Sequence, residues 1–401
     1  MQELTDTPEA RAEDAVVLRG TNQSGMRAQN ERIVLSLLRT HGALAKTDIA
    51  RMTGLSAQTV SVIMRELEQD GLLIRREKLR GKVGQPLVPM ALAPDGAFFL
   101  GLKVGRRSTE LMLVDFLGKP VAQERKSYPY PTPDAVIGFV RHALPLLSAR
   151  LPPALAARIA GIGIAQPFQL WNWAQFIGAP QSEMDAWRHR NLQAEVAALT
   201  GLPVWLQNDA TAACGAELVF GRDERPRDFL YFFIAHFIGG GLVLNGKLHT
   251  GPTGNAAAIG SMPVLAQGGG LKQLISLASL FQLERAMTER GLDARTIWEQ
   301  AEDWPIPAPV RRDWIARAAP AMAQAVLAAS AVVELRAAMI DGWMPPDWRA
   351  DLVAAVRGAM LRLDFSGIEM PEIIEGTIGH QARSLGAAAI PLSQRFLSET
   401  V

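Results

Sequence analysis

The sequence is poor in cysteine, in long apolar runs and in net charge. Cys214 is the single cysteine among 401 residues, which excludes an internal disulfide framework and is typical of a reducing compartment. We interpret Cys214 as a small core residue of an alanine-rich helix. No run of about 18 uninterrupted apolar residues occurs, and the acidic N-terminus lacks the apolar segment of a signal peptide. We therefore expect a soluble, cytoplasmic protein without a membrane partner.

The composition nevertheless favours a large folded protein with one basic region. Hydrophobic residues make up 48% of the chain and charged residues 20%, which is typical of buried cores, and 401 residues suffice for two or three domains. The net charge of the whole chain is +1, but residues 21–90 hold eleven Lys and Arg against six Asp and Glu. A basic segment in a nearly neutral chain indicates an anionic partner at one end only.

Three short helices are predicted in this basic segment. The first covers residues 27–41 and ends at Gly42. We expect Thr47 to cap a second helix over 48–53, and Ser56 to cap a third that runs to Asp70. This order predicts a helix-turn-helix, in which the third helix enters the DNA major groove.

Two β-strands follow, over 72–78 and 86–92, and their glycine-rich connection over 79–85 resembles the tip of a wing that can enter a minor groove. The alternative is a helical protein-interaction module with solvated charges. The candidate DNA-binding residues are Thr47, Ser56, Gln58, Thr59, Ser61, Arg65, Arg80, Lys82 and Gln85.

The remaining residues alternate between strand-like and helix-like segments. Two or three strands are predicted over 98–121 with a turn at 115–118, a helix over 133–148, and strands over 159–167 and 203–209. Residues 229–251 read as a strand, a glycine-rich turn and a second strand. Strand pairs followed by helices predict α/β lobes around a cleft.

Four segments of this region resemble the ROK family (repressor, open reading frame, kinase), in its regulator branch with an N-terminal winged helix-turn-helix. They are GIGIAQP, PVWLQNDATAACGAE, IGGGLVLNGKLHTGPTGNAAAIGSM and IEMPEIIEGTIGHQARSLGAAAIPLSQRF. The resemblance implies an α/β protein with a two-lobed actin-like (ribonuclease H-like) sugar-kinase fold. Sugar and nucleotide sites would lie in the cleft, and the last helix would pack back on the first lobe.

The expected domain organisation follows from this resemblance. A flexible tail over 1–24 precedes the winged helix-turn-helix over 25–95, and the ROK domain covers 96–401. Its first lobe is expected over about 96–225 with the helix at about 380–398, and its second over about 226–379.

Both phosphate-binding turns of the family depart from their pattern. Where the resemblance implies an acidic residue followed by small ones, this chain has Lys103 and then Arg106 and Arg107. In the second turn His236 and Phe237 occupy positions near the nucleotide phosphates. We therefore predict that ATP does not bind, that no residue is catalytic and that the protein is not an enzyme. The alternative is that Arg106 and Arg107 bind another anion.

The metal and sugar sites are also altered. Zinc needs about four nitrogen or sulfur ligands, and the family's zinc cysteines and histidine are missing, so neither a metal nor a cofactor is expected. Asn208 and Asp209 match a sugar-binding pair, and Asn255 is a further ligand candidate, whereas Ala258 and Ser261 replace a glutamate and a histidine that the resemblance places on the sugar. Asn208 and Asp209 could instead only cap the next helix. Two tryptophans after the GIGIAQP strand could stack on a sugar or pack in the core, Trp171 and Trp173.

These features together predict a DNA-binding transcriptional regulator, most simply a repressor of carbohydrate-metabolism genes. Its partners would be a double-stranded DNA operator, a small sugar or polyol effector, and further copies of itself in a homodimer or homotetramer. The catalytically inactive kinase-like domain would sense the effector. The alternatives are a ROK sugar kinase that phosphorylates a hexose, and a dimerisation scaffold without a ligand.

Overall fold

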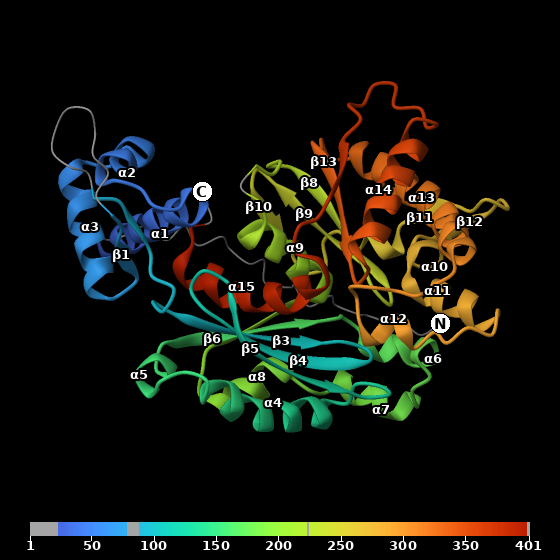
Figure 1. The fold of residues 1–401 in the computed structure, drawn as a ribbon, viewed down its shortest axis with the longest axis horizontal. Coiled ribbons are helices and arrows are strands. Elements are labelled where there is room, and N and C mark those ends of the chain that lie inside the picture. Colours follow the sequence, from blue (N-terminus) through green and yellow to red (C-terminus); the bar gives the residue numbers. More distant parts are fainter. Residues whose placement is uncertain (1–22, 78–87, 223, 399–401) are drawn as a thin grey trace, which may run out of the picture.

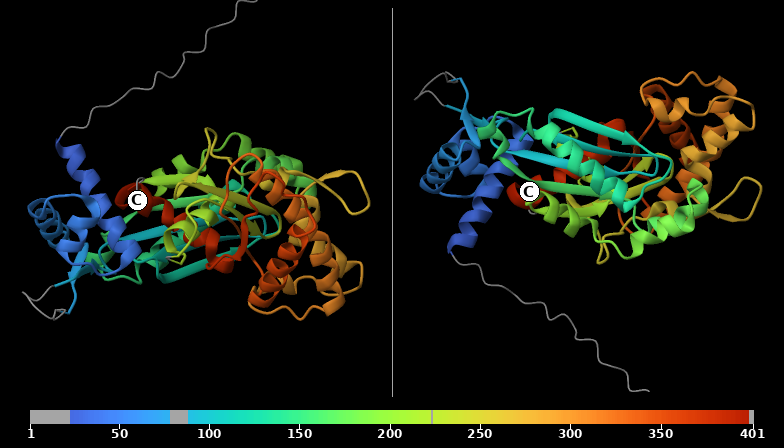
Figure 2. Two further views of the ribbon diagram at one scale, coloured as in Figure 1. Left: turned by 90° about the horizontal axis from the view of Figure 1, so that it is seen from above. Right: turned by 90° about the horizontal axis from the view of Figure 1, so that it is seen from below.

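A computed structural model describes residues 23–77, 88–222 and 224–398. Three parts follow one another along the long axis in Figure 1: a winged helix, a first lobe and a second lobe. Figure 2 shows the winged helix at the end of the molecule opposite to α13 and α14. The fold combines α and β structure throughout.

The winged helix contains α1 (Gln23–His41), α2 (Lys46–Thr53), α3 (Ala57–Gln69), β1 (Leu73–Arg75) and β2 (Met90–Leu92). Its two strands pair antiparallel, and Leu44 adds an isolated bridge to Met90 beside this small sheet. The described strands are shorter than the 72–78 and 86–92 that the sequence predicts, and the first helix begins four residues earlier than predicted. Apolar side chains of the three helices and both strands form one core.

The first lobe is built on a five-stranded sheet in the order β5-β4-β3-β6-β7. Its strands are β3 (Phe98–Val104), β4 (Ser108–Val114), β5 (Pro120–Ser127), β6 (Ile159–Gln166) and β7 (Val204–Asn208). The first three are antiparallel, and β6 and β7 continue the sheet in parallel with β3. The predicted helix over 133–148 is present as α4 (Pro133–Ser148), which begins at a Thr132 cap.

Short helices join the strands of this lobe and cover the lower face of its sheet in Figure 1 together with α4. They are α5 (Pro153–Ala156), η1 (Leu170–Trp173), α6 (Ala174–Ile177), α7 (Gln181–Asp185), η2 (Ala186–Arg188) and α8 (Leu192–Thr200). The opposite face is covered by α15 (Ala382–Phe396), the last helix, with α9 (Asp209–Phe220) beside it. The packing of the last helix on the first lobe agrees with the family resemblance.

The second lobe repeats the topology of the first. Its sheet has the order β10-β9-β8-β13-β14, again with three antiparallel and then two parallel strands. These strands are β8 (Phe229–Ile234), β9 (Ile238–Leu244), β10 (Lys247–His249), β13 (Ala337–Gly342) and β14 (Glu372–Glu375). The glycines at 239–241, expected in the turn between β8 and β9, lie within β9, where Gly240 and Gly241 face the side chains of Ile259 and Cys214 at short distance.

The outer elements of the second lobe are mostly helical. They are η3 (Ile259–Ser261), β11 (Pro263–Leu265), β12 (Leu271–Gln273), α10 (Ile275–Ala278), α11 (Leu280–Thr288), α12 (Thr296–Glu299), α13 (Ala308–Ser330), α14 (Pro346–Met360) and η4 (Gly379–Gln381). Within the described ranges, no helix is long and apolar enough to cross a membrane.

Glycines allow α15 to approach both the sheet and α9 closely. A Cβ atom at Gly163 would lie 1.9 Å from the carbonyl oxygen of Ala387, and one at Gly386 would lie 1.9 Å from that of Ala212. Both distances are far shorter than a non-bonded contact between a carbon and an oxygen atom allows. The backbones of β6, α9 and α15 are therefore in direct contact, so α15 forms a rigid link between the interior of the first lobe and the helix that borders the second.

Candidate functional site

The third helix of the winged helix presents a polar face away from the core. Gln58 and Arg65 are exposed and Ser61 is half-buried, and their spacing of three and four residues places them on one face of α3. The opposite stripe is buried and consists of Val60, Ile63, Met64 and Leu67. This arrangement leaves three of the predicted DNA-binding side chains available to a groove.

Ser56 and Thr59 hold the first turn of α3. The Ser56 hydroxyl accepts a hydrogen bond from the Thr59 amide at 3.1 Å, and the two hydroxyl oxygens are 2.8 Å apart. The predicted cap at Ser56 is thus confirmed. Both hydroxyls have a structural role, while the remaining free amides of the turn point out of the N-terminus, where a DNA phosphate is favoured.

The prediction that Thr47 caps the second helix is wrong. Helix α2 begins at Lys46, its cap residue is Ala45, and no side chain accepts a hydrogen bond there. Thr47 therefore lies one residue inside the first turn, where its side chain is exposed. Its assignment to DNA binding remains a prediction.

One residue of the same face escaped the sequence analysis. Val62 is 37% exposed, although we would assign a valine in this helix to the core. It lies next to Ser61 and four residues from Gln58, so it is on the presented face, where an apolar group can contact a thymine methyl. Exposure was the only signal for Val62. Arg80, Lys82 and Gln85, the predicted wing residues, lie outside the described residues.

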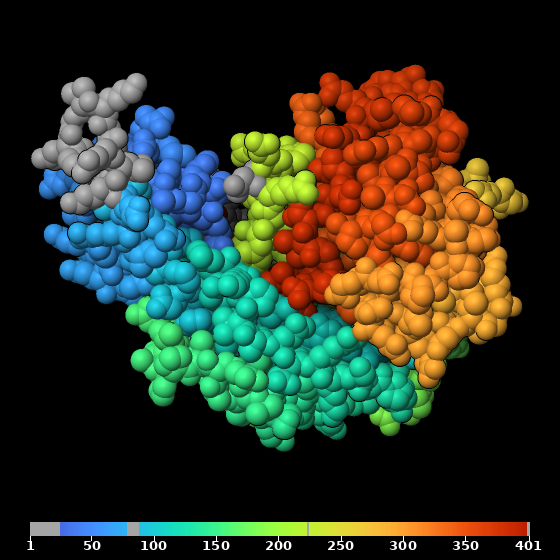
Figure 3. Space-filling view, viewed as in Figure 1, coloured from blue at the N-terminus to red at the C-terminus, as the bar shows by residue number. Residues whose placement is uncertain are grey.

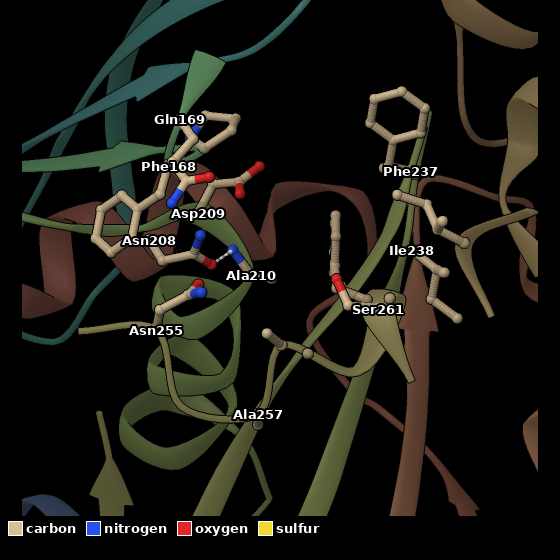
Figure 4. A pocket seen from close by; sticks show the side chains of 18 of the residues that line it. Phe168, Gln169, Asn208, Asp209, Ala210, Phe237, Ile238, Asn255, Ala257 and Ser261 are labelled. Atoms are coloured by element: carbon tan, nitrogen blue, oxygen red, sulfur yellow. Dashed lines mark hydrogen bonds between the residues drawn. The ribbon is translucent and has the colours of Figure 1, made fainter. Parts of the chain in front are cut away.

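A second candidate site is the cleft between the two lobes. It has a volume of about 190 Å³. Figure 4 shows Asn208, Asp209 and Asn255 on one wall, with Phe237 and Ser261 on the other. The predicted ligand residues Asn208, Asp209 and Asn255 are thus brought together.

The side chains of the Asn208–Asp209 pair are already engaged. The Asn208 side-chain oxygen accepts hydrogen bonds from the amides of Ala210 at 3.0 Å and Thr211 at 3.3 Å, so the capping interpretation holds for this residue. Asp209 forms an ion pair with Arg383 of α15 at 3.3 Å, and only 13% and 12% of the two side chains are exposed. A ligand hydroxyl at Asp209 would have to share this carboxylate with Arg383.

Arg383 was missed because nothing in its local sequence marks it. It lines the cleft, its guanidinium lies 5.2 Å from the ring centre of Phe233, and its buried Nε has no partner within the described part of the chain. The last helix therefore supplies a cation to the cleft from 174 residues further along the sequence.

The segments that contain Arg106 and Phe237 contact each other through their side chains. The Arg106 guanidinium lies 4.1 Å from the ring centre of Phe237 and 5.3 Å from that of Trp173. The rings of Trp173 and Phe237 are 4.5 Å apart. Burial lowers the pKa of Arg106 to about 10, so this arginine stays charged near neutral pH. Arg106, Trp173 and Phe237 therefore pack together at the cleft between the two lobes.

Lys103 and His236 are not arranged to meet a phosphate. Lys103 is buried and donates to Glu110 at 2.8 Å and to Ser108 at 2.9 Å. Burial lowers the pKa of His236 to about 3, a shift to which the neighbouring Arg106 adds, so the imidazole is neutral. Neither side chain offers a free positive charge to the cleft.

The remaining predicted positions differ in their surroundings. Asn255, Ala258 and Ser261 all line the cleft. Trp171 instead lies beneath the Arg188 guanidinium, 5.1 Å from the ring centre, and is not among the residues that line the cleft. Over residues 23–77, 88–222 and 224–398, no group of three or more His, Cys, Asp or Glu side chains could hold a metal ion.

These two sites define a class of protein: a winged helix joined to a two-lobed kinase-like domain with a cleft between its lobes. A model of the ROK family matches residues 99–393, and one of the MarR family matches residues 24–80. The chain belongs to the ROK family.

Similar proteins include both regulators and kinases. The xylose repressor of Bacillus spizizenii is 24% identical over 247 residues, which are 61% of this chain and 62% of that protein. A solved ROK family transcriptional regulator, described as a homologue of E. coli MLC, superposes with a TM-score of 0.66 at 18% identity and covers 94% of this chain and 98% of its own. A Streptomyces griseus ROK glucokinase, solved with glucose and AMPPNP, has a TM-score of 0.57 at 21% identity and covers 73% of this chain and 98% of its own. At these identities the two structures show the fold alone.

Proposed function

We propose that this protein is a DNA-binding transcriptional repressor of carbohydrate-metabolism genes, whose ROK domain senses a sugar or polyol without phosphorylating it. The observation that carries the proposal is the combination of an exposed polar face on α3 with a cleft whose phosphate turns are filled by Arg106, Trp173 and Phe237. The likeness to a xylose repressor supports the same conclusion.

The DNA contact rests on the surface of the winged helix. Gln58, Ser61 and Arg65 would contact bases or phosphates in the major groove, and Arg80 and Lys82 would reach the minor groove. At the borders of this contact surface would lie Thr47, Ser56, Thr59 and Gln85. Arg27 and Arg75 are already paired with Glu66 and Glu68.

The effector would bind in the cleft at Asp209 and Asn255. An ionised carboxylate accepts hydrogen bonds from hydroxyl groups, which suits a polyhydroxylated ligand. The same carboxylate is held by Arg383 at 3.3 Å, which fixes its position in the cleft. The pairing supports a role for Asp209 in holding a ligand.

Helix α15 would transmit the signal. Its first turn carries Arg383 at the cleft, and beyond its last turn the Ser398 amide donates to the Ser36 hydroxyl of α1 at 2.9 Å. A helix of this length is rigid over about 22 Å. If a sugar displaces Arg383 from Asp209, the shift of α15 reaches α1 and changes the spacing of two winged helices in a homodimer or homotetramer.

Two other functions keep specific support. A sugar kinase is favoured by the retained Asp209, and a scaffold without a ligand is favoured by Ala258 and Ser261 at positions that lack sugar-binding side chains. The kinase would release ADP from ATP in the presence of a hexose, and the scaffold would bind DNA without responding to any sugar.

A DNA-binding test comes first. Genomic fragments that the purified chain retains are sequenced, and the recovered site is used in a mobility-shift assay. We expect a pseudo-palindrome whose half-sites are separated by whole helical turns. Arg65→Ala with Gln58→Ala should weaken specific binding by about tenfold or more, whereas Arg141→Ala on the exposed face of α4 should not. Failure to retain any sequence above background would refute the DNA-binding proposal.

The effector test uses the same operator. Hexoses, pentoses and polyols are screened for a change in operator affinity and for ADP release from ATP. We expect one of them to change the affinity without ADP release, and Asp209→Asn to abolish the response while operator binding persists. ADP release that depends on a sugar would establish the kinase instead.

A further inference from the structure

A second and larger cavity lies where the winged helix meets the ROK domain. Its volume is about 580 Å³, within the range of small-molecule sites. Helix α1 forms one wall, and α9, β10 and α15 form the others. Figure 3 shows the surface hollowed between the blue winged helix and the yellow-green segment that contains β10. No assignment made above uses this cavity.

The charge of the lining is of one sign. Four cationic residues contribute to it: Arg32, Arg39, Arg225 and Lys247. No aspartate or glutamate is among the described residues that line it. Within the described ranges, Arg32, Arg39 and Lys247 form no ion pair.

Arg39 is partly buried in this wall and forms no ion pair within the described residues. One of its terminal nitrogens donates to the Phe116 carbonyl oxygen, and its guanidinium lies 5.6 Å from the ring centre of Phe220. Its buried Nε has no partner within the described residues. Burial lowers the pKa of Arg39 to about 10, against the opposing influence of Asp115, so the side chain remains a cation. A partly buried cation with no carboxylate in direct contact is stabilised by a bound anion.

The rest of the lining suits a small polar organic molecule. Hydroxyl and amide groups come from Ser36, Thr40, Gln207 and Ser393, and Phe220 adds an apolar surface. Hydrogen-bonding groups around a cluster of arginines and a lysine are the usual surroundings of a phosphate ester.

We propose that this cavity binds a small phosphorylated metabolite, with its phosphate among Arg32, Arg39 and Lys247. Arg32 and Arg39 belong to α1 and Lys247 to β10. One phosphate bound by residues of both α1 and β10 would link the winged helix to the second lobe. The binding site stands independently of the proposed repressor function, and only its consequence for operator affinity rests on that function.

The binding test uses the full chain at 150 mM KCl. Isothermal titration and thermal shift are measured with inorganic phosphate, glucose 6-phosphate and fructose 1,6-bisphosphate, and with glucose as the uncharged comparison. We expect saturable binding of at least one phosphate ester and none of glucose at this site. Absence of saturable binding by all three phosphates would overturn the proposal.

The variants locate the bound anion. Arg32→Gln with Lys247→Gln should weaken phosphate-ester binding by at least about tenfold, and folding should persist because the Lys247 side chain is exposed and Arg32 is only half-buried. The matched control, Arg141→Gln with Arg312→Gln, removes the same charge from exposed positions of α4 and α13 and should bind as the unmodified chain does. Equal binding by both double variants would place the anion elsewhere and refute the site.

Asn255→Ala separates this proposal from the proposed function. Asn255 lines the cleft and is not among the residues that line the second cavity, so phosphate-ester binding should be unaffected. Loss of binding in Asn255→Ala would assign the phosphate to the cleft and overturn the proposal. Failure of the operator experiments would leave the binding result unchanged.

Discussion

The ion pair between Asp209 and Arg383 allows a quantitative test of how strongly α15 is held at the cleft. At 3.3 Å, two unit charges attract each other by about 5 kcal/mol at an effective dielectric constant of about 20. Because each side chain keeps an exposed fraction of 12–13%, desolvation and solvent screening reduce the measurable coupling to about 1–3 kcal/mol.

The assay is a double-mutant cycle on the free energy of unfolding, measured with urea. Asp209→Asn leaves Arg106 and Arg383 in a cleft without any lining carboxylate, so we expect a loss of about 2 kcal/mol. Arg383→Gln should cost about the same, in part through the lost contact with Phe233. The double variant should be clearly more stable than the sum of the two losses predicts.

Arg383→Lys serves as the matched control because it keeps the charge and loses the planar guanidinium. It should retain part of the coupling. A coupling energy near zero would mean that Arg383 does not hold Asp209. That result would refute the reasoning that this ion pair organises the cleft.

Three further predictions concern other parts of the chain. Ser56→Ala should lower the free energy of unfolding of the winged helix by about 1 kcal/mol, because the Thr59 amide loses its acceptor, and Ser56→Asn should restore most of it in the same urea titration. Arg80→Ala with Lys82→Ala should weaken operator binding and reduce the slope of log affinity against log salt by about two; an unchanged slope would contradict the wing assignment. Burial opposes ionisation of Glu110, but Lys103 outweighs it and lowers the pKa of Glu110 to about 2. Because the folded pKa lies below the usual value of 4.5, the stabilisation is present above pH 4.5 and is lost as the pH falls towards 2. Glu110→Gln should flatten this acid limb of a stability–pH profile.

The elements of the fold were largely predictable because local rules set their limits. Thr132 and Pro133 mark the start of α4, and short, mostly apolar runs such as 98–104 and 229–234 define the buried strands of the two lobes. The helix cap predicted at Thr47 is wrong. A threonine followed by an aspartate is a typical helix start, but Ala45 already has the extended backbone of the cap residue.

The contents of the cleft and of the second cavity were less predictable. Asn208, Asp209 and Asn255 were found from family patterns, but Arg383 reaches Asp209 across 174 residues of sequence, and no periodicity reveals that distance. The apposition of Arg106 and Phe237 required the two hairpins to face each other. The same holds for Arg39, whose surroundings are set by how α1 lies on the ROK domain.

The position of α15 also has a consequence for how the chain is made. Residues of β3 and β6 leave the ribosome more than 200 residues before the helix that covers their sheet, and Gly163 has a fitting surface only for that helix. During synthesis the nascent first lobe therefore carries an uncovered apolar face until the final segment emerges. A chain truncated before Ala382 would keep this face uncovered, and we expect it to aggregate.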